Sequence, residues 1–130
     1  MAQRPELTNT INNGKGLVSA ANTNRDGTGT IVTLLTAGSN GTLIRRISIK
    51  ADGRPADSCV LIYLYDGSSY YVFDEFDLGA PAAPSATVSS YQDTRGYTDI
   101  KISSGWSVRA SITAAPTSGA VHVLVFGENF

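Results

Sequence analysis

The sequence predicts an all-β domain folded as an antiparallel sandwich of two sheets, and three observations predict it. Asn-Gly and Asp-Gly dipeptides, which suit tight turns, occur at 13–14, 26–27, 40–41, 52–53 and 66–67. Short runs rich in Val, Ile, Thr and Tyr, the residues that favour strands, lie between these turns. No segment shows the apolar period of a helix. Turns at this spacing are typical of sandwiches and barrels, and a jelly-roll-like arrangement is expected.

In chain order, the expected strands are 16–21, 28–35, 43–51, 59–65, 70–76, 86–91, 97–102, 106–114 and 120–126. Segment 106–114 has the clearest period of two, with Trp106 and Val108 on one side and Ser107 and Arg109 on the other. This alternation places Trp106 in the core. Segment 59–65, "CVLIYLY", is apolar on both faces, so it should be a central strand or one covered by a partner.

The first fifteen residues differ from the rest of the chain. Residues 1–15 contain Pro5, several Asn and Thr, and no strong periodicity, which indicates an extended N-terminal arm that is ordered only when something binds it. Residues 16–130 then form a single sandwich domain that should fold without the arm. Leu7 and Ile11 are spaced so that an extended arm could place both in pockets of a neighbouring subunit.

Composition argues against several classes of partner. The 130 residues carry a formal net charge of −1, so no basic field draws the chain to nucleic acid or membrane. The charged share is 16%, well below the usual quarter, which favours a protein that works in an assembly. No apolar run is long enough for a membrane span, and "MAQRPELTNT" lacks the apolar core of a signal peptide. Synthesis as a soluble protein in a cytoplasm is therefore expected.

The residues that could carry out chemistry are few. A Ser-His-Asp or Cys-His device would need His122, the single histidine, which lies in an apolar strand pattern. One Cys, Cys59, and one His cannot assemble a zinc site or close a disulfide within the chain. The acidic cluster 74–77, "DEFD", is interpreted as a solvated strand end. The sequence therefore predicts no catalytic residue, no metal site, no cofactor and no enzymatic activity.

Contact with a partner is the better expectation for several side chains. Arg45 falls on the apolar side of its strand, where it would lie at a sheet rim, pair with a carboxylate or anchor an interface. Tyrosines gather around the turn at 66–67, and Tyr is common both at interfaces and in carbohydrate sites. Ordinary packing at strand ends is the alternative for them. The interface candidates are Leu7, Ile11, Arg45, Tyr63, Tyr65, Tyr70, Tyr71 and Phe130.

Several segments, taken together, resemble a group of small tailed-bacteriophage virion proteins. They are "NTNRDGTGTIVTLLTAGSNGTLIRRISIKADG", "VLIYLYDGSSYYVFDEFDL", "PSATVSSY", "SSGWSVRAS" and the ending "VHVLVFGENF". The resemblance covers roughly residues 22–130. It implies a β-sandwich structural component of the virion, similar in size and character to capsid cement, or decoration, proteins. It implies no catalytic residue, and it leaves residues 1–21 unmatched.

Three hypotheses follow. The first is a head cement protein on the capsid surface, which binds the major capsid protein lattice, stabilises it by added buried area, and forms a small homo-oligomer, with a trimer favoured over a dimer. The second is a sandwich module of a tail or fibre that recognises host glycans through its tyrosines. A small hydrolase is the third and least favoured. Copy number per virion separates the first two, because a cement protein is abundant and a fibre component is not.

Overall fold

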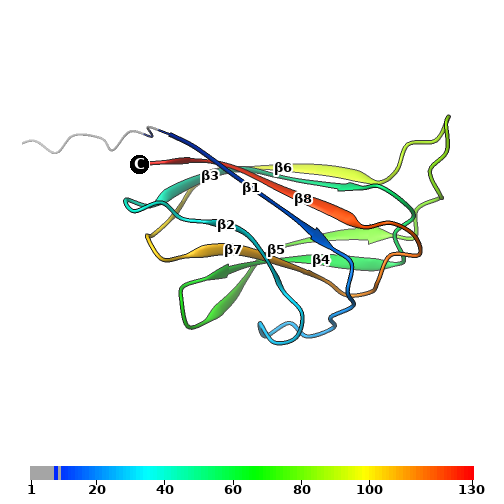
Figure 1. The fold of residues 1–130 in the computed structure, drawn as a ribbon, viewed down its shortest axis with the longest axis horizontal. Helices are drawn as coiled ribbons and strands as arrows, with labels where there is room; N and C mark the ends of the chain where they lie inside the picture. Colours follow the sequence, from blue (N-terminus) through cyan, green and yellow to red (C-terminus); the bar gives the residue numbers. More distant parts are fainter. Residues whose placement is uncertain (1–7, 9) are drawn as a thin grey trace, which may run out of the picture.

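The computed structural model describes residues 8 and 10–130, and within them the chain forms eight strands (Figure 1). These are β1 (Thr10–Val18), β2 (Val32–Thr36), β3 (Thr42–Ala51), β4 (Ser58–Tyr65), β5 (Tyr70–Gly79), β6 (Gln92–Ile102), β7 (Ser107–Ile112) and β8 (Val121–Asn129). Every pairing between strands is antiparallel. None of the described residues belongs to a helix, so no helix there could cross a membrane. The all-β prediction is confirmed.

The strands form two four-stranded sheets that lie as an upper and a lower layer in Figure 1. The upper sheet has the order β1-β8-β3-β6 and the lower sheet has the order β2-β7-β4-β5. Thus β1 pairs with β8, β2 with β7, β3 with β6 and β4 with β5, as in a two-stranded ribbon wrapped into a sandwich. This is the strand order of an eight-stranded jelly roll.

The core lies between the two sheets and is built from alternate residues of strands in both sheets. Ile44 and Ile47 of β3, Ile62 of β4, Phe76 of β5 and Val108 of β7 have no exposed surface. Each such side chain contributes about 1.5–3 kcal/mol through removal from water. Trp106 lies just before β7 and is half-buried against this core. It therefore packs on the predicted side but at the rim of the core.

The strand β1 corrects the expected boundary of the arm. Thr10–Lys15, assigned above to the arm, form the first part of β1 and pair with Leu124–Asn129 of β8. The reason is a close approach that only glycine allows. A Cβ on Gly14 would lie 2.0 Å from the carbonyl oxygen of Leu34, and a Cβ on Gly16 would lie 2.7 Å from side-chain atoms of Leu34 and Val32. The rest of the expected arm, residues 1–7 and 9, lies outside the described residues.

A cluster of polar side chains fixes β1 at one end of the sandwich. Asn12 Nδ2 donates to the carbonyl of Thr36 at 3.0 Å and to Asn129 Oδ1 at 2.9 Å. The hydroxyl of Thr42 donates to the same Asn129 oxygen at 2.7 Å and accepts from the main-chain N–H of Gly38 at 2.9 Å. The cluster therefore joins β1, β8, β3 and the turn after β2, and it occupies the side of β1 that faces the other sheet.

The connection between β1 and β2 is a compact loop ordered by Asn22. Its side chain, which is 5% exposed, donates to the carbonyls of Thr28 and Thr30, each at 2.9 Å. Its main-chain N–H donates to the carbonyl of Ile112, which attaches the loop to β7. Gly29 has a φ of +83°, and a Cβ there would lie 2.6 Å from Asn22 Oδ1. Thr28–Ile31, expected in a strand, therefore belong to this loop.

This loop covers the outer side of the lower sheet, beneath which it passes in Figure 1. Tyr63 of β4 points outward yet is completely buried, and its hydroxyl donates to the carbonyl of Asn24 at 3.1 Å. Arg25 of the loop forms an ion pair with Glu75 of β5, and Gly27 lies against the ring of Tyr70. The segment "CVLIYLY" is thus a central strand, as predicted, and the chain itself covers its outer face.

The expected strand at 86–91 is wrong. These residues belong to the connection between β5 and β6, in which the hydroxyl of Ser85 accepts from the main-chain N–H groups of Thr87 and Val88. The main-chain N–H of Ser85 in turn donates to the carbonyl of Val88 at 2.8 Å. The segment is therefore closed on itself as a turn, and β6 begins only at Gln92.

Deleting residues 2–14 should destabilise the protein, although the sequence alone indicated a dispensable arm. The deletion removes half of β1 and the hydrogen bonds of Asn12, which leaves Thr42 and Asn129 with fewer partners. We expect the melting temperature to fall by more than about 5 °C in circular dichroism. Ile11→Ala is the control, because this side chain is 75% exposed and should leave the melting temperature nearly unchanged. Equal melting temperatures for the deletion and native chains would contradict the assignment of β1.

Candidate interaction surface

The two residues considered for nucleophilic chemistry, Cys59 and His122, lie apart in the fold. Cys59 of β4 in the lower sheet and His122 of β8 in the upper sheet each alternate with core residues, so their side chains point away from one another on opposite outer faces. His122 Nε2 lies 2.9 Å from Asp52 Oδ2, and Asp52 Oδ1 accepts from the main-chain N–H of Ala120 at 2.7 Å. Asp52 thus joins the end of β3 to the start of β8. Among residues 8 and 10–130, no three His, Cys, Asp or Glu side chains converge as metal ligands would.

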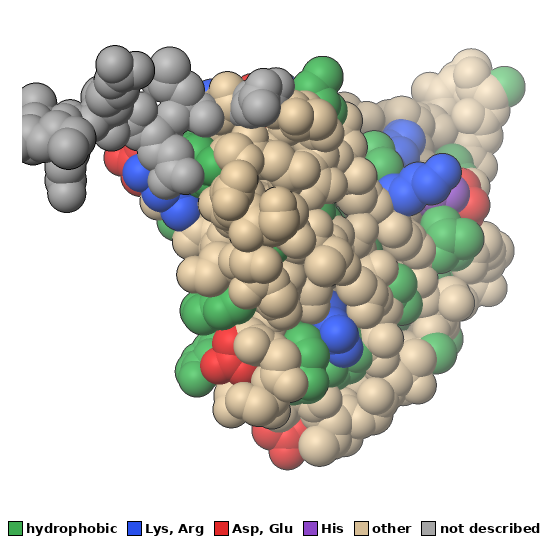
Figure 2. Space-filling view, turned by 60° about the vertical axis from the view of Figure 1, so that its left-hand side comes forward, with side chains coloured by type: hydrophobic (Ala, Val, Ile, Leu, Met, Phe, Trp, Pro, Cys, Tyr) green, Lys and Arg blue, Asp and Glu red, His purple; other side chains and the backbone are tan. Residues whose placement is uncertain are grey.

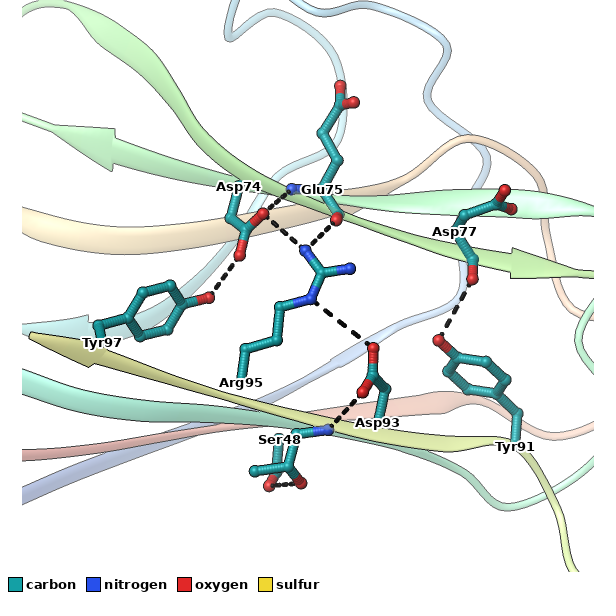
Figure 3. A network of polar contacts seen from close by, with 9 residues as sticks. Ser48, Asp74, Glu75, Asp77, Tyr91, Asp93, Arg95 and Tyr97 are labelled. Carbon is teal, nitrogen blue, oxygen red and sulfur yellow. Dashed lines mark hydrogen bonds and ion pairs between the residues drawn. The ribbon is translucent and has the colours of Figure 1, made fainter.

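The acidic cluster at 74–77 belongs to a network that joins the two sheets at their open edge (Figure 3). Arg95 of β6 donates to Asp74 Oδ1 at 2.7 Å and to the carbonyl of Glu75 at 2.6 Å. Tyr97 of the same strand donates to Asp74 Oδ2 at 2.6 Å. The guanidinium also lies over the ring of Phe76, 4.2 Å from its centroid. Instead of ending a strand in solvent, Asp74 therefore bridges β5 to β6.

The environment of Tyr97 explains why this bridge is stable. Partial burial, together with the hydrogen bond to Asp74, raises the pKa of Tyr97 well above its usual value. The phenol therefore keeps its proton, and remains a donor, at neutral and moderately alkaline pH. The side chains of this network bond to one another within the chain, so the network stabilises the contact between β5 and β6.

The predicted interface tyrosines have three different environments. Tyr63 is fully buried, so it presents no surface to a partner and is corrected to a packing residue. Tyr65 and Tyr70 stack with ring centroids 4.3 Å apart, and the guanidinium of Arg109 lies 4.1 Å from the Tyr65 centroid. Tyr71 is 54% exposed, so it remains available for contact beside the β4–β5 turn.

The other predicted interface residues lie on or near the upper sheet, Leu7 excepted, which is outside the described residues. Arg45 points outward, because the register of β3 shifts between Ile44 and Arg46, and it forms an ion pair with Glu128 at 2.9 Å. The expected inward position of Arg45 is therefore wrong, and the expected carboxylate partner is present. Ile11 is exposed on β1. The main-chain N–H of Phe130 donates to the carbonyl of Gly41, which ties the end of the chain to the β2–β3 turn.

The outer face of the upper sheet carries an apolar strip. Alternate residues of β8 point inward as Val121, Val123 and Val125 with no exposed surface, which turns Leu124 and Phe126 outward. Ile11 and Leu17 lie on the same face near the two ends of β1, and they are 75% and 51% exposed. Sequence reasoning did not single out Leu17, Leu124 and Phe126, which the structure places on this outer face. The signal was present, because "VHVLVF" is apolar on both faces, as is the covered strand β4.

Basic side chains flank this apolar strip. Lys15 of β1 lies opposite Leu124, and Arg46 of β3 lies opposite Phe126 with its guanidinium 5.7 Å from the ring centroid. Lys50 of β3 lies opposite His122. We call this surface, with its apolar strip and these three cations, the basic-apolar face. Figure 2 shows the histidine (purple) with basic (blue) and acidic (red) side chains against it.

Two shallow hollows lie on the basic-apolar face. One is lined by Lys15, Gly16, Leu17, His122 and Leu124. The second lies toward the other end of β1 and β8, and its lining includes Ile11, Arg46, Phe126 and Glu128. Each combines apolar side chains with a cation, which is the composition of a protein contact surface rather than of an enclosed ligand pocket.

Comparison with known proteins gives a likeness of fold. No family model matches the sequence, and no curated protein sequence is significantly similar to it. A chain in the acidic stable capsid structure of Helicobacter pylori bacteriophage KHP30 has a TM-score of 0.57 and 16% identity, over 94% of this chain and 90% of that chain. A chain of the cyanophage Pam1 capsid asymmetric unit has a TM-score of 0.46 and 16% identity, over 100% and 94%. At 16% identity, the KHP30 likeness shows a shared fold.

Tyr97→Phe should destabilise the protein by about 1–2 kcal/mol, because it removes a short hydrogen bond to a partly buried carboxylate. Tyr91→Phe is the matched control, since the Tyr91 hydroxyl makes a longer bond of 3.3 Å to the carbonyl of Asp77 in a more exposed place. Its effect should be below about 0.5 kcal/mol. Urea unfolding monitored by fluorescence measures both. Equal midpoints for the two variants would show that the Tyr97–Asp74 contact does not stabilise the fold.

Stability should fall in acid. Hydrogen bonds lower the pKa of four carboxyl groups. Thr28 donates to Asp26, and Ala120 and then His122 have the largest effects on Asp52. Ser69 and then Ser68 have the largest effects on Asp66, and Thr8 and then Arg45 on Glu128. The unfolded chain therefore binds more protons, and this stabilisation is complete above the unfolded pKa values and is lost as pH falls through the folded ones. We expect a flat melting temperature from pH 7 to about pH 5.5 and a decline below about pH 4.5.

Asp66→Ala tests the origin of this decline. The variant lacks the bonds from the main-chain N–H groups of Ser68 and Ser69, so it should melt below the native protein at pH 7. The difference should shrink as pH falls below about 4, because protonation of the native carboxyl weakens these bonds. Melting curves that stay equally far apart from pH 7 to about pH 2.5 would contradict the assignment.

Proposed function

We propose that the chain is a non-enzymatic structural protein of a bacteriophage virion and, more specifically, a head cement protein that binds the major capsid protein lattice and stabilises the capsid. The observation that carries the proposal is the fold shared, over 94% of this chain, with a chain of a solved bacteriophage capsid. The sequence resemblance to small virion proteins supports the same assignment. The single cysteine and the single histidine lie in different sheets, so they do not form a nucleophile and base pair.

The physical basis of cementing is added buried surface at the joints of the lattice. A bound protein that contacts the assembled capsid and not its separated subunits stabilises the assembled state by mass action. The basic-apolar face suits such a contact, since Leu17 and Ile11 expose apolar surface that contact would remove from water. A chain with a net charge of −1 does not repel its own copies strongly, which suits dense decoration.

The proposal includes a place and an oligomeric state. The protein is made in the host cytoplasm and resides on the capsid surface of the virion. Lattice joints lie near symmetry axes, so a small homo-oligomer is expected, with a trimer favoured and a dimer as the alternative. It needs no cofactor, nucleic acid or membrane.

A glycan-binding module of a tail or fibre is the second candidate. The observation that favours it is the group of tyrosines at the β4–β5 hairpin, where Tyr71 is 54% exposed and Tyr65 stacks on Tyr70 beside Arg109. Aromatic rings with polar tips are suited to sugar contacts. Against it, the hydroxyls of Tyr65 and Tyr70 already bond to Gly67 and Arg109 within the chain.

Copy number and particle stability test the proposal. In purified virions, gel densitometry should give a ratio of this chain to the major capsid protein of the order of one to one or one to a few, as expected for a protein at every lattice joint. Particles that lack the chain should release DNA at a lower temperature, and adding back the purified protein should restore the native release temperature.

A few copies per particle, with tyrosine-dependent binding to host cells, would instead support the glycan-binding module. Release temperatures that are the same with and without an abundant chain would exclude cementing while leaving a virion structural role.

A further inference from the structure

The basic-apolar face differs from the rest of the molecule in both its charge and its covering. The outer side of the lower sheet is covered by the loop after β1, through Tyr63, Arg25 and Gly27. On the upper sheet, Ile11 and Leu17 remain 75% and 51% exposed. Exposed aliphatic side chains on the outside of a sheet, next to Leu124 and Phe126, mark a surface that is buried in an assembly.

The charge on this face is positive although that of the chain is negative. The Arg45–Glu128 pair is internally compensated, and Asp52, beside His122, adds one negative charge at the end of the face. Lys15, Arg46 and Lys50 form no ion pair with any described residue, so three cations remain around the apolar strip. Because the formal charge of the whole chain is −1, the remainder of the molecule carries the acidic excess.

The three cations and the apolar strip together indicate which kind of partner the basic-apolar face binds. Two copies that met face to face would bring the same three cations together, and like charges across an interface are costly. A nucleic acid would satisfy the cations but would leave Ile11, Leu17, Leu124 and Phe126 without apolar contacts, and strong binding to phosphates uses more cations than three. A protein surface with an apolar centre and a carboxylate rim satisfies both kinds of side chain.

We propose that the basic-apolar face docks onto a carboxylate-rimmed apolar surface of the major capsid protein. Apolar side chains of the partner enter the two hollows, and its carboxylates lie against Lys15, Arg46 and Lys50. This assignment rests on the proposed function, since it names the chemistry of the partner at the contact that cementing requires. It also assigns the homo-oligomer contact to a different part of the surface.

The experiment measures binding of the purified protein to heads that lack it, by cosedimentation at several salt concentrations. The charge variant is Lys15→Glu with Arg46→Glu. Its matched control is Arg25→Glu with Arg54→Glu, two exposed cations in the loops after β1 and β3. The apolar variant is Leu17→Ser, and its control is Val88→Ser, which is 44% exposed in the β5–β6 connection. Melting temperatures confirm that each variant is folded.

We expect the charge variant and Leu17→Ser each to weaken binding by at least about tenfold, and each control by less than about twofold. Binding of the native protein should also weaken as salt rises from about 50 to about 500 mM, because the attraction between charges is screened. The free protein should keep the same sedimentation coefficient in the native and Leu17→Ser forms.

Three results would overturn the proposal while leaving the cement function in place. One is native binding that the charge variant and Leu17→Ser do not weaken more than their controls. Another is a change of oligomeric state caused by Leu17→Ser, which would place a second copy on the face. The third is binding of a duplex DNA probe to the native protein but not to the charge variant, while the native protein and the charge variant bind heads equally well. Failure of the native protein to bind heads would overturn the docking proposal together with the cement function.

Discussion

Burial of one face of each sheet against the other is the constraint on which the rest of the structure depends. The inward residues of β3, β4, β7 and β8 supply a core with almost no exposed surface. Because strand side chains alternate, filling this core determines which residues point outward. Val121, Val123 and Val125 must point inward, so Leu124 and Phe126 are turned to the outside. The basic-apolar face is a direct consequence of core packing in β8.

The edges of the sandwich are closed by different chemistry on its two sides. At the β1–β2 edge, glycines bring the sheets so close that Gly14 meets the backbone of Leu34. At the β5–β6 edge, the sheets are joined by Arg95, Asp74 and Tyr97. One closure relies on the absence of side chains and the other on polar side chains that satisfy one another.

The two outer faces suggest how such a domain works in an assembly. The lower face is closed by the loop that contains Asn22, whose hydrogen bonds make it part of the folded unit. The upper face keeps aliphatic side chains between cations. Contact with a partner would remove these apolar side chains from water, which is favourable. Under the proposed function, the open upper face would contact the lattice and the closed lower face would remain in solvent.

The sequence by itself determined the all-β class, the two-sheet sandwich and most of the central strands, because turn dipeptides and alternation are local signals. The strand β1 was hidden, since Gly14, Gly16 and the neighbouring asparagines look like a turn until the closeness of β2 explains them. Segment 86–91 was misread for the opposite reason, because Ser85 closes a turn within a β-favouring run. Which apolar strand is covered by the chain, as β4 is through Tyr63, and which remains open, as β8 does, was decided by the tertiary structure alone. Both strands are apolar on two faces, and only the path of the loop after β1 distinguishes them.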